Sequence, residues 1–295
     1  MGRTKAQPVS IVLPAFHAAH AIGRAVESVL RQTHSAWELL IIADDEFDYQ
    51  KLLGDLGLAD TRIRFFATGA TGSGSSPTRN IGLDEARYDY VATLDADDLF
   101  HPEKLERVLP HLKAHGIVSC GLQISDADLL PLRQVGTQAT GSLAASLYKF
   151  ANLSGDSMLV FDRKICDPRY NASFPCLTDI VFLLRLFEVN FGVFHIGEPL
   201  HIYTKQSLSV SNKPGASGLM KQTKIRLMSL LQDGAFPLAD PDGVAGMLAF
   251  YTHSLDAEQS YGARLAQKPS LLFEDHLEVF LDSKTAGSTA SHRRP

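Results

Sequence analysis

The chain has 295 residues, of which 45% are hydrophobic and 21% are charged, and its formal net charge is −5 at pH 7. This length allows one large or two modest domains with a sizeable core, and the small negative charge excludes nucleic acid as an expected partner. No apolar run approaches the roughly 20 residues of a membrane-spanning helix, and residues 1–8 are polar, without the apolar core of a signal peptide.

The three cysteines, Cys120, Cys166 and Cys176, are an odd number and lack the spacing of a metal site. Each has apolar or mixed neighbours, which predicts buried free thiols. Free thiols persist in a reducing compartment, so we expect the protein in the cytoplasm.

The first half of the chain alternates short apolar runs with segments of helical periodicity. Expected strands are residues 9–13, 38–43, 63–67 and 90–94, and expected helices are residues 22–30, 49–57, 78–86 and 102–115. Residues 68–77 form a loop rich in Gly and Ser, and Pro110 is expected to kink or shorten the last helix. This alternation predicts parallel βαβ units with helices on both faces of the sheet.

Polar or special residues follow three of these strands: Pro14-Ala15-Phe16, Asp44-Asp45 and Asp95-Ala96-Asp97-Asp98. Right-handed crossovers place such strand ends at one edge of the sheet, where ligands bind. A buried acidic cluster is costly unless a positive group offsets it, and hard divalent cations prefer oxygen ligands. The alternative is an acidic loop in which Asp98 caps the next helix.

The second half of the chain is more mixed. Expected strands are residues 117–124, 157–161, 193–197 and 200–204, and expected helices are residues 179–189, 219–231, 244–266 and 271–281. The helix over residues 179–189 is apolar on nearly every side, which predicts that it is buried. Residues 283–295 are small and polar and predict a disordered tail.

The order of these pieces resembles the family 2 inverting glycosyltransferases of the GT-A fold, over residues 8–211. The motifs that carry the resemblance are Val9-Ser10-Ile11-Val12-Leu13-Pro14-Ala15-Phe16, Ser28-Val29-Leu30-Arg31-Gln32-Thr33, Glu38-Leu39-Leu40-Ile41-Ile42, Asp44-Asp45, Arg79-Asn80-Ile81-Gly82-Leu83, Leu94-Asp95-Ala96-Asp97-Asp98, Thr178-Asp179 and Pro199-Leu200-His201-Ile202-Tyr203. Each motif alone is weak, whereas their shared order and spacing are specific.

The resemblance implies an α/β, Rossmann-like GT-A domain over residues 1–213, with a mostly parallel sheet and helices on both faces. Residues 8–115 would be its nucleotide-binding half and residues 116–213 its acceptor-binding half. A C-terminal helical region over residues 214–282 and the tail 283–295 would follow.

The resemblance also implies a nucleotide-diphosphate sugar as donor, with Mn²⁺ or Mg²⁺ as cofactor. Asp97 would bind the metal, Asp95 would bind the ribose or the metal, and Ala96 would keep the turn small beside the nucleotide. The metal would stabilise the negative charge that develops on the leaving diphosphate. His201 is a further candidate ligand, and its alternative is a buried histidine satisfied by its neighbours.

Asp45 matches the family position that reads the uracil ring, which makes a UDP-sugar the expected donor, and Asp44 is expected to be structural. Pro14, Ala15 and Phe16 would line the donor site, with the Phe16 ring packed on the base or, alternatively, in the core. The family usually continues this motif with Gly-Ser, whereas this chain has Glu46-Phe47.

Positive groups are expected near the diphosphate. Arg79 would meet the base or the diphosphate, and its alternative is an ion pair with Asp84 or Glu85. Tyr203 and Lys205 match the family's late segment, in which side chains face the diphosphate.

Inversion requires a general base on the face of the sugar opposite the leaving group. Asp179 matches the family's acidic residue at the start of a buried helix, although Thr178 replaces the usual Glu before it. The alternative for Asp179 is a charge in the first turn of the helix without a catalytic role.

We therefore predict a metal-dependent inverting glycosyltransferase of the hexosyltransferase type, acting on a hydroxyl of a glycan or glycolipid in cell-surface polysaccharide synthesis. A sugar nucleotidyltransferase is an alternative, but it needs a Gly-rich phosphate loop that residues 14–18 do not offer. A non-catalytic nucleotide-sugar-binding protein of the same fold is another alternative.

A basic cluster in the second half of the chain consists of Lys213, Lys221, Lys224 and Arg226. This cluster predicts contact with the inner membrane face or with a lipid-linked acceptor. The alternative is a solvated surface without a partner.

Overall fold

The computed structural model describes residues 7–151, 158–205, 216–268, 271 and 273–288. The strands are β1 (Val9–Ala15), β2 (Trp37–Ala43), β3 (Ile63–Ala67), β4 (Tyr90–Thr93), β5 (Leu99–Phe100), β6 (Ile117–Ser125), β7 (Pro131–Val135), β8 (Gly141–Ala144), β9 (Val160–Asp162) and β10 (Gly192–Thr204). The helices are α1 (Ile22–Leu30), α2 (Tyr49–Asp55), α3 (Ser75–Glu85), α4 (Lys104–His115), α5 (Ala145–Tyr148), the 3₁₀ helix η1 (Lys149–Ala151), α6 (Thr178–Phe187), α7 (Ala216–Gln232), α8 (Gly243–Gln267) and α9 (Phe273–Ser288).

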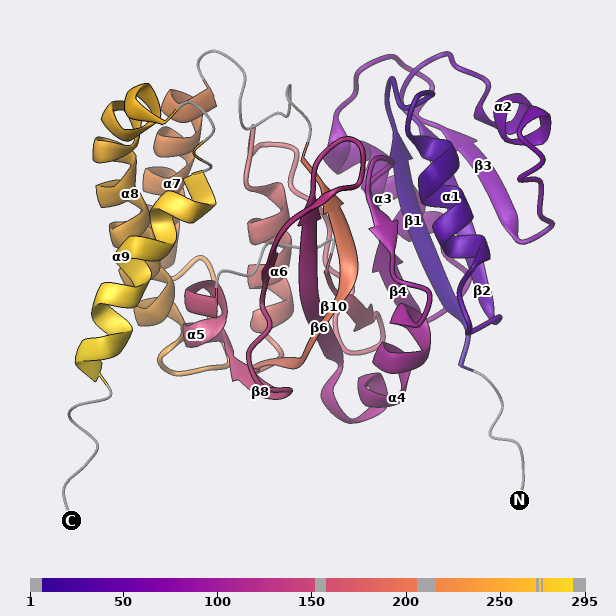
Figure 1. Cartoon of the computed structure of the whole chain (residues 1–295). Coiled ribbons are helices and arrows are strands. Elements are labelled where there is room, and N and C mark those ends of the chain that lie inside the picture. Colours follow the sequence, from indigo (N-terminus) through magenta and orange to yellow (C-terminus); the bar gives the residue numbers. More distant parts are fainter. Residues whose placement is uncertain (1–6, 152–157, 206–215, 269–270, 272, 289–295) are drawn as a thin grey trace.

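One sheet runs through the molecule, with the order β3-β2-β1-β4-β9-β6-β10-β5 (Figure 1). Strands β1 to β4 pair in parallel, as expected from their apolar runs. Ala15 lies opposite Ala43 and Val12 lies opposite Thr93, so the carboxyl ends of β1, β2 and β4 meet at one edge. The structure thus places the motifs that follow these strands at a common edge.

The second half of the sheet contains antiparallel pairs that the sequence analysis did not predict. Strand β9 joins the two halves because it runs antiparallel to both β4 and β6. Strands β5 and β8 pair antiparallel with β10, and β7 pairs antiparallel with β6. These strands are short, so their sequences carry little periodicity and their pairing depends on distant partners.

Several predicted boundaries require correction. The two strands expected over residues 193–197 and 200–204 are one strand, β10, with register shifts around Pro199. Pro110 lies inside α4, which continues through it to His115. Helix α9 extends to Ser288, into the tail that we expected to be disordered, and residues 289–295 lie outside the described residues.

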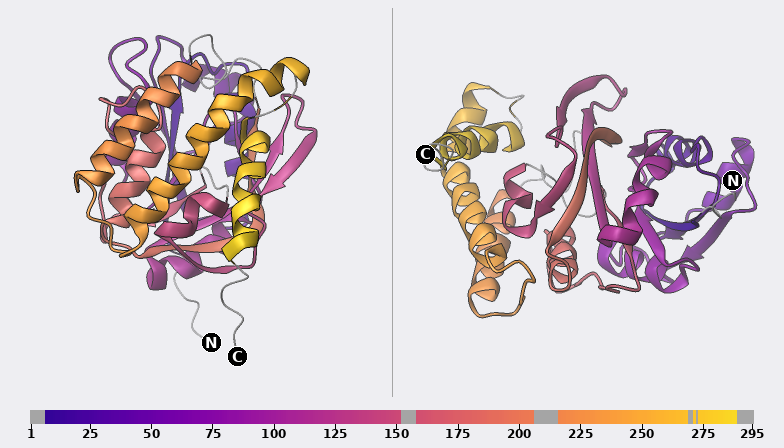
Figure 2. Two further views of the ribbon diagram at one scale, coloured as in Figure 1. Left: turned by 90° about the vertical axis from the view of Figure 1, so that its left-hand side faces the viewer. Right: turned by 90° about the horizontal axis from the view of Figure 1, so that it is seen from below.

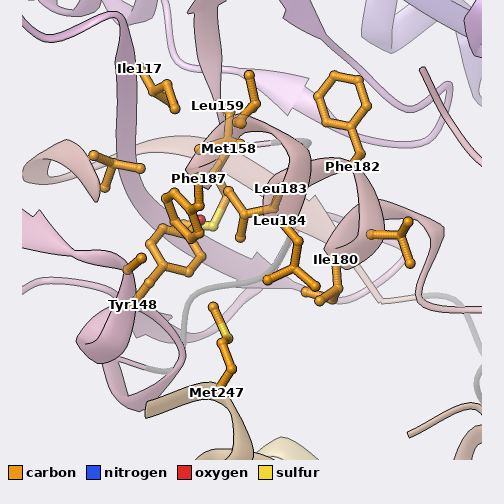
Figure 3. Close-up of a cluster of buried hydrophobic side chains, with 14 of the residues drawn as sticks. Ile117, Tyr148, Met158, Leu159, Ile180, Phe182, Leu183, Leu184, Phe187 and Met247 are labelled. Atoms are coloured by element: carbon orange, nitrogen blue, oxygen red, sulfur yellow. The ribbon is translucent and has the colours of Figure 1, made fainter. Parts of the chain in front are cut away.

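Helix α6 is buried in the core that joins the sheet to the C-terminal helices. Phe182, Leu183, Leu184 and Phe187 of α6 are fully buried. Figure 3 shows this cluster, with Met247 of α8 beneath the helix. Each such side chain stabilises the fold by about 1.5–3 kcal/mol relative to exposure.

The C-terminal helices α7, α8 and α9 lie together on the side of the molecule away from β1–β3 (Figures 1 and 2). Across the described ranges, no helix has both the length and the apolar character needed to cross a membrane. The three cysteines are free thiols; Cys120 is buried, whereas Cys166 and Cys176 are half-buried and so less enclosed than expected.

Candidate active site

The candidate site begins where β1 and β2 end. The backbone N–H of Asp44 donates to the Ala15 carbonyl at 2.8 Å, which holds the two strand ends together. Pro14 and Ala15 are the last residues of β1. The Phe16 side chain beyond them is 48% exposed, so its alternative role in the core does not hold.

A surface hollow of about 610 Å³ lies beside Asp45. Its lining residues are His17, Ala19, Asp45, Glu46, Phe47, Tyr49 and Thr71. One carboxylate oxygen of Asp45 accepts from the His17 N–H at 2.6 Å and from the Tyr49 hydroxyl at 2.9 Å. These two donors hold the nearly buried carboxylate in place at the wall of the hollow. No sequence motif indicated Tyr49, although it lies four residues after Asp45.

Asp44 has the structural role that we expected. Its carboxylate accepts hydrogen bonds from the Thr68 hydroxyl at 2.9 Å and from the backbone N–H groups of Ser73 and Gly74 at 2.9 and 2.8 Å. Burial opposes the charged form, but these hydrogen bonds outweigh burial and lower the pKa of Asp44. Asp44 therefore ties the Gly/Ser-rich loop to the end of β2.

The acidic turn after β4 places Asp95, Ala96 and Asp97 half-buried at the same edge. The guanidinium of Arg79, on α3, donates to Asp95 at 2.5 Å. The two carboxylates considered as alternative partners have other cations: Asp84 pairs with Arg169 and Glu85 pairs with Arg64. Arg79 therefore pairs with the acidic turn, a partner that neither of the two expectations for this residue included.

Asp97 lies in an environment that disfavours its charge. Burial, followed by the negative charge of Asp95, raises the pKa of Asp97, and His20 and Arg24 counteract these effects only in part. A cation between the two carboxylates would reverse this penalty. Although no group of three or more His, Cys, Asp or Glu in the described ranges forms a complete metal site, a cation shared with a diphosphate needs only one or two carboxylates. Asp95 and Asp97 fit such a cation.

Asp98 and His201 have other partners than the sequence analysis considered. Asp98 does not cap α4, because that helix begins at Lys104 and Glu103 occupies its N-cap position. The buried Asp98 carboxylate lies 3.0 Å from His201 Nε2, and Lys104 Nζ lies 2.9 Å from His201 Nδ1. Since both ring nitrogens of His201 have protein partners, the geometry favours the alternative of a satisfied buried histidine.

Asp179 lies half-buried in the first turn of α6. Asn190, beyond the other end of α6, donates to the His115 carbonyl just before β6 begins. Helix α6 therefore runs opposite to β6, with its first turn and Asp179 toward the carboxyl end of that strand.

Tyr170 connects the acidic turn with α6, and no sequence motif indicated it. Its ring lies 5.4 Å from the Arg79 guanidinium and stacks on Phe182 at 4.2 Å. The Asn80 side chain also exchanges two hydrogen bonds with the Tyr170 backbone. Phe182 lies one turn after Asp179, so this chain of contacts joins the two halves of the candidate site.

Tyr203 and Lys205 lie at the end of β10, and the Lys205 ammonium is 5.7 Å from the Tyr203 ring. The Lys205 N–H donates to the Ser125 carbonyl at 2.8 Å, which places this residue at the carboxyl end of β6 as well. The basic cluster is smaller than expected. Lys224 is buried and paired with Glu258 at 2.8 Å, and Lys213 lies outside the described residues.

This edge, with a carboxylate in a hollow, an acidic turn and an acidic helix start, is the arrangement expected for the GT-A class of sugar transferases. The model of glycosyl transferase family 2 matches residues 10–161, just over half of the chain. The chain therefore belongs to glycosyl transferase family 2.

Curated relatives support this assignment. The chain is 38% identical over 98 residues to the Escherichia coli UDP-Glc:alpha-D-GlcNAc-diphosphoundecaprenol beta-1,3-glucosyltransferase WfgD, covering 33% of this chain and 38% of that protein. It is 36% identical over 110 residues to an uncharacterised glycosyltransferase of Rickettsia felis, covering 37% of this chain and 18% of that protein. The matches therefore span well under half the length of these two relatives. A putative teichuronic acid biosynthesis glycosyltransferase of Bacillus subtilis is 28% identical over 69% of this chain and 81% of its own length.

Solved structures confirm the GT-A fold. Staphylococcus aureus TarS 1-349 in complex with UDP-GlcNAc aligns with a TM-score of 0.65 and 12% identity over 93% of this chain and 79% of that chain. The mannosyltransferase PcManGT of Pyrobaculum calidifontis, in complex with GDP-Man and Mn²⁺, aligns with a TM-score of 0.57 and 13% identity over 98% of this chain and 89% of that chain. At this identity the likeness supports the fold alone.

Proposed function

We propose that this protein is an inverting glycosyltransferase that moves a sugar from a UDP-sugar to a hydroxyl of a glycan or lipid-linked acceptor in cell-surface polysaccharide synthesis. The observation that supports the proposal is that Asp45 and Asp97 follow strands whose carboxyl ends share one edge of the sheet, while Asp179 lies in the first turn of the buried helix α6. Family membership favours this activity over a sugar nucleotidyltransferase. The UDP-sugar named for two similar proteins supports the choice of donor.

The donor would lie across the ends of β1, β2 and β4. The Asp45 carboxylate, held by Tyr49, would accept from the N–H of the uracil ring, and the exposed Phe16 ring would pack on the base. Asp95 and Asp97 would hold Mn²⁺ or Mg²⁺, which supplies Lewis-acid stabilisation of the diphosphate when bound. Lys205 and Tyr203 would contact the diphosphate from the end of β10.

Transfer would proceed in line. The acceptor oxygen forms a bond to the anomeric carbon while the bond from that carbon to the diphosphate oxygen breaks, and UDP leaves. The Asp179 carboxylate, as general base, takes the proton of the attacking hydroxyl. The positive N-terminal end of α6 would stabilise the charged carboxylate before transfer, so a charge in the first turn of the helix and catalysis are compatible there.

A thermal-shift panel tests the donor and the cation. UDP, GDP and TDP, with their sugars, are added with and without Mn²⁺ to the wild type and to the Asp97→Asn variant. A ligand that binds only the folded state raises the melting temperature, and the rise grows with the ratio of ligand concentration to Kd. We expect UDP with Mn²⁺ to give the largest shift in the wild type and little shift in Asp97→Asn. A preference for GDP would contradict the role of Asp45.

Turnover separates an enzyme from a non-catalytic binding protein. With Mn²⁺ and a UDP-sugar, slow hydrolysis of the donor is expected from the wild type, and Asp179→Asn should lose it while still binding UDP. Donor binding without any hydrolysis or transfer would favour the non-catalytic alternative. Hydrolysis of the donor by Asp179→Asn at the wild-type rate would exclude Asp179 as the general base.

A further inference from the structure

Three ionisable side chains lie buried behind the acidic turn, and the proposed reaction does not use them. Asp98 is 1% exposed, and Lys104 and His201 are fully buried. His201 lies between the other two, with Nδ1 2.9 Å from Lys104 Nζ and Nε2 3.0 Å from Asp98 Oδ2. We call these three residues the buried relay.

The contacts assign the direction of each hydrogen bond. A lysine ammonium has only donors, so His201 Nδ1 accepts from Lys104. His201 Nε2 then carries the ring proton and donates to Asp98. The ring is neutral in this arrangement, in agreement with burial and the nearby Lys104 charge, which lower the pKa of His201 well below its usual value. The relay therefore joins the Lys104 ammonium and the Asp98 carboxyl group through a neutral imidazole.

The relay is attached to the acidic turn at one end. The backbone N–H of Asp98 donates to the Asp95 carbonyl at 3.1 Å and closes the turn. The second carboxylate oxygen of Asp98 accepts from the Thr204 N–H at 2.8 Å. Thr204 is the residue between Tyr203 and Lys205 in the chain. Asp98 thus connects the turn with the segment of β10 that we expect to face the diphosphate.

Backbone pairing fixes the other side of the turn. His201 pairs with Phe100 and Ile202 with Leu99, and the His101 N–H donates to the Leu200 carbonyl at 3.0 Å. The Lys104 ammonium also lies 3.9 Å from the Phe100 ring. The turn is therefore held both by strand pairing and by the relay.

Stability alone does not explain the relay. Replacing a buried charged network by apolar residues of similar volume is often neutral or stabilising. Residues that orient metal ligands, by contrast, affect metal affinity strongly. We propose that Lys104, His201 and Asp98 are positioning residues that hold the Asp95–Asp97 turn against β10 in the geometry that binds the cation and the diphosphate. This inference rests on the proposed function.

The test compares variants by the Mn²⁺ concentration that gives half-maximal UDP binding, with melting temperature measured alongside. His201→Leu removes both ring nitrogens, whereas His201→Gln retains one donor and one acceptor. The double variant Asp98→Asn/Lys104→Met is the second test, in case His201→Leu fails to fold. It changes both outer residues of the relay together, so that neither is left buried opposite an unmatched partner. Lys224→Met is the matched control, because Lys224 is also a buried, ion-paired lysine but lies on α7.

We expect the half-maximal Mn²⁺ concentration to rise about 10- to 100-fold in His201→Leu and in the double variant. It should return toward the wild-type value in His201→Gln and stay unchanged in Lys224→Met, even where the melting temperature falls. A folded His201→Leu or double variant with the wild-type Mn²⁺ response would overturn this inference alone. A wild type without any Mn²⁺-dependent UDP binding would overturn the proposed function, and this inference with it.

Discussion

Asp44→Asn is expected to destabilise the fold by loosening the loop beside the base hollow. In the wild type, Thr68 and Ser73 donate to one carboxylate oxygen of Asp44 and Gly74 donates to the other. Asparagine retains only one oxygen. If that oxygen keeps the first two donors, the side-chain NH₂ faces the Gly74 N–H, so two donors oppose each other.

The size of the effect follows from these three hydrogen bonds. Leaving the Gly74 N–H without an acceptor costs about 1–3 kcal/mol. The two remaining bonds lose their charge assistance, and neutral hydrogen bonds are about half as strong as charged ones. We therefore expect a loss of about 2–4 kcal/mol in the free energy of unfolding, measured by urea denaturation at neutral pH.

Asp48→Asn is the matched control. The Asp48 carboxylate accepts from the Lys51 N–H at the start of α2 at 2.8 Å. Asparagine caps a helix about as well as aspartate, so this variant should change stability by less than about 0.5 kcal/mol. Equal stabilities of Asp44→Asn and Asp48→Asn would refute the reasoning.

The pH dependence provides a second check on Asp44. Because the folded-state pKa of Asp44 lies below its unfolded value, its contribution is fully present above the unfolded pKa of about 3.9. The contribution is lost as the pH falls through the folded-state pKa. The stability difference between the wild type and Asp44→Asn should therefore shrink in acid, and a constant difference would contradict the assigned hydrogen bonds.

Three further substitutions test the close approach of a helix to the sheet and one buried hydroxyl group. Gly82→Ala would place a Cβ 2.3 Å from a Val12 methyl and should lower the free energy of unfolding by about 1–3 kcal/mol. Gly54→Ala is the control, because nothing lies within 4 Å of the added Cβ, and this variant should be about 0.5–1 kcal/mol more stable than the wild type. Equal urea midpoints for Gly82→Ala and Gly54→Ala would contradict the close approach of α3 to β1. Tyr251→Phe should raise stability by about 1 kcal/mol in thermal unfolding, because the buried Tyr251 hydroxyl has no hydrogen-bond partner among the described residues. A lower melting temperature would show that the hydroxyl is satisfied.

The sequence by itself determined the parallel half of the sheet and the edge that carries the site. Strands such as Val9–Ala15 are buried on both faces, so they read as continuous apolar runs. Chain topology then brings the residues after β1, β2 and β4 together, without information on any side-chain contact. Asp45, Asp95 and Asp97 could be selected on this basis.

Only the tertiary structure decided the partners within the site. Asp98 looked like a helix cap and His201 like a possible ligand, but they lie against each other although 103 positions separate them in the chain. Arg79 had acidic neighbours in its own helix, yet it pairs with Asp95. Local sequence patterns report propensity and periodicity, whereas the charge state and role of a buried group depend on what the fold packs around it.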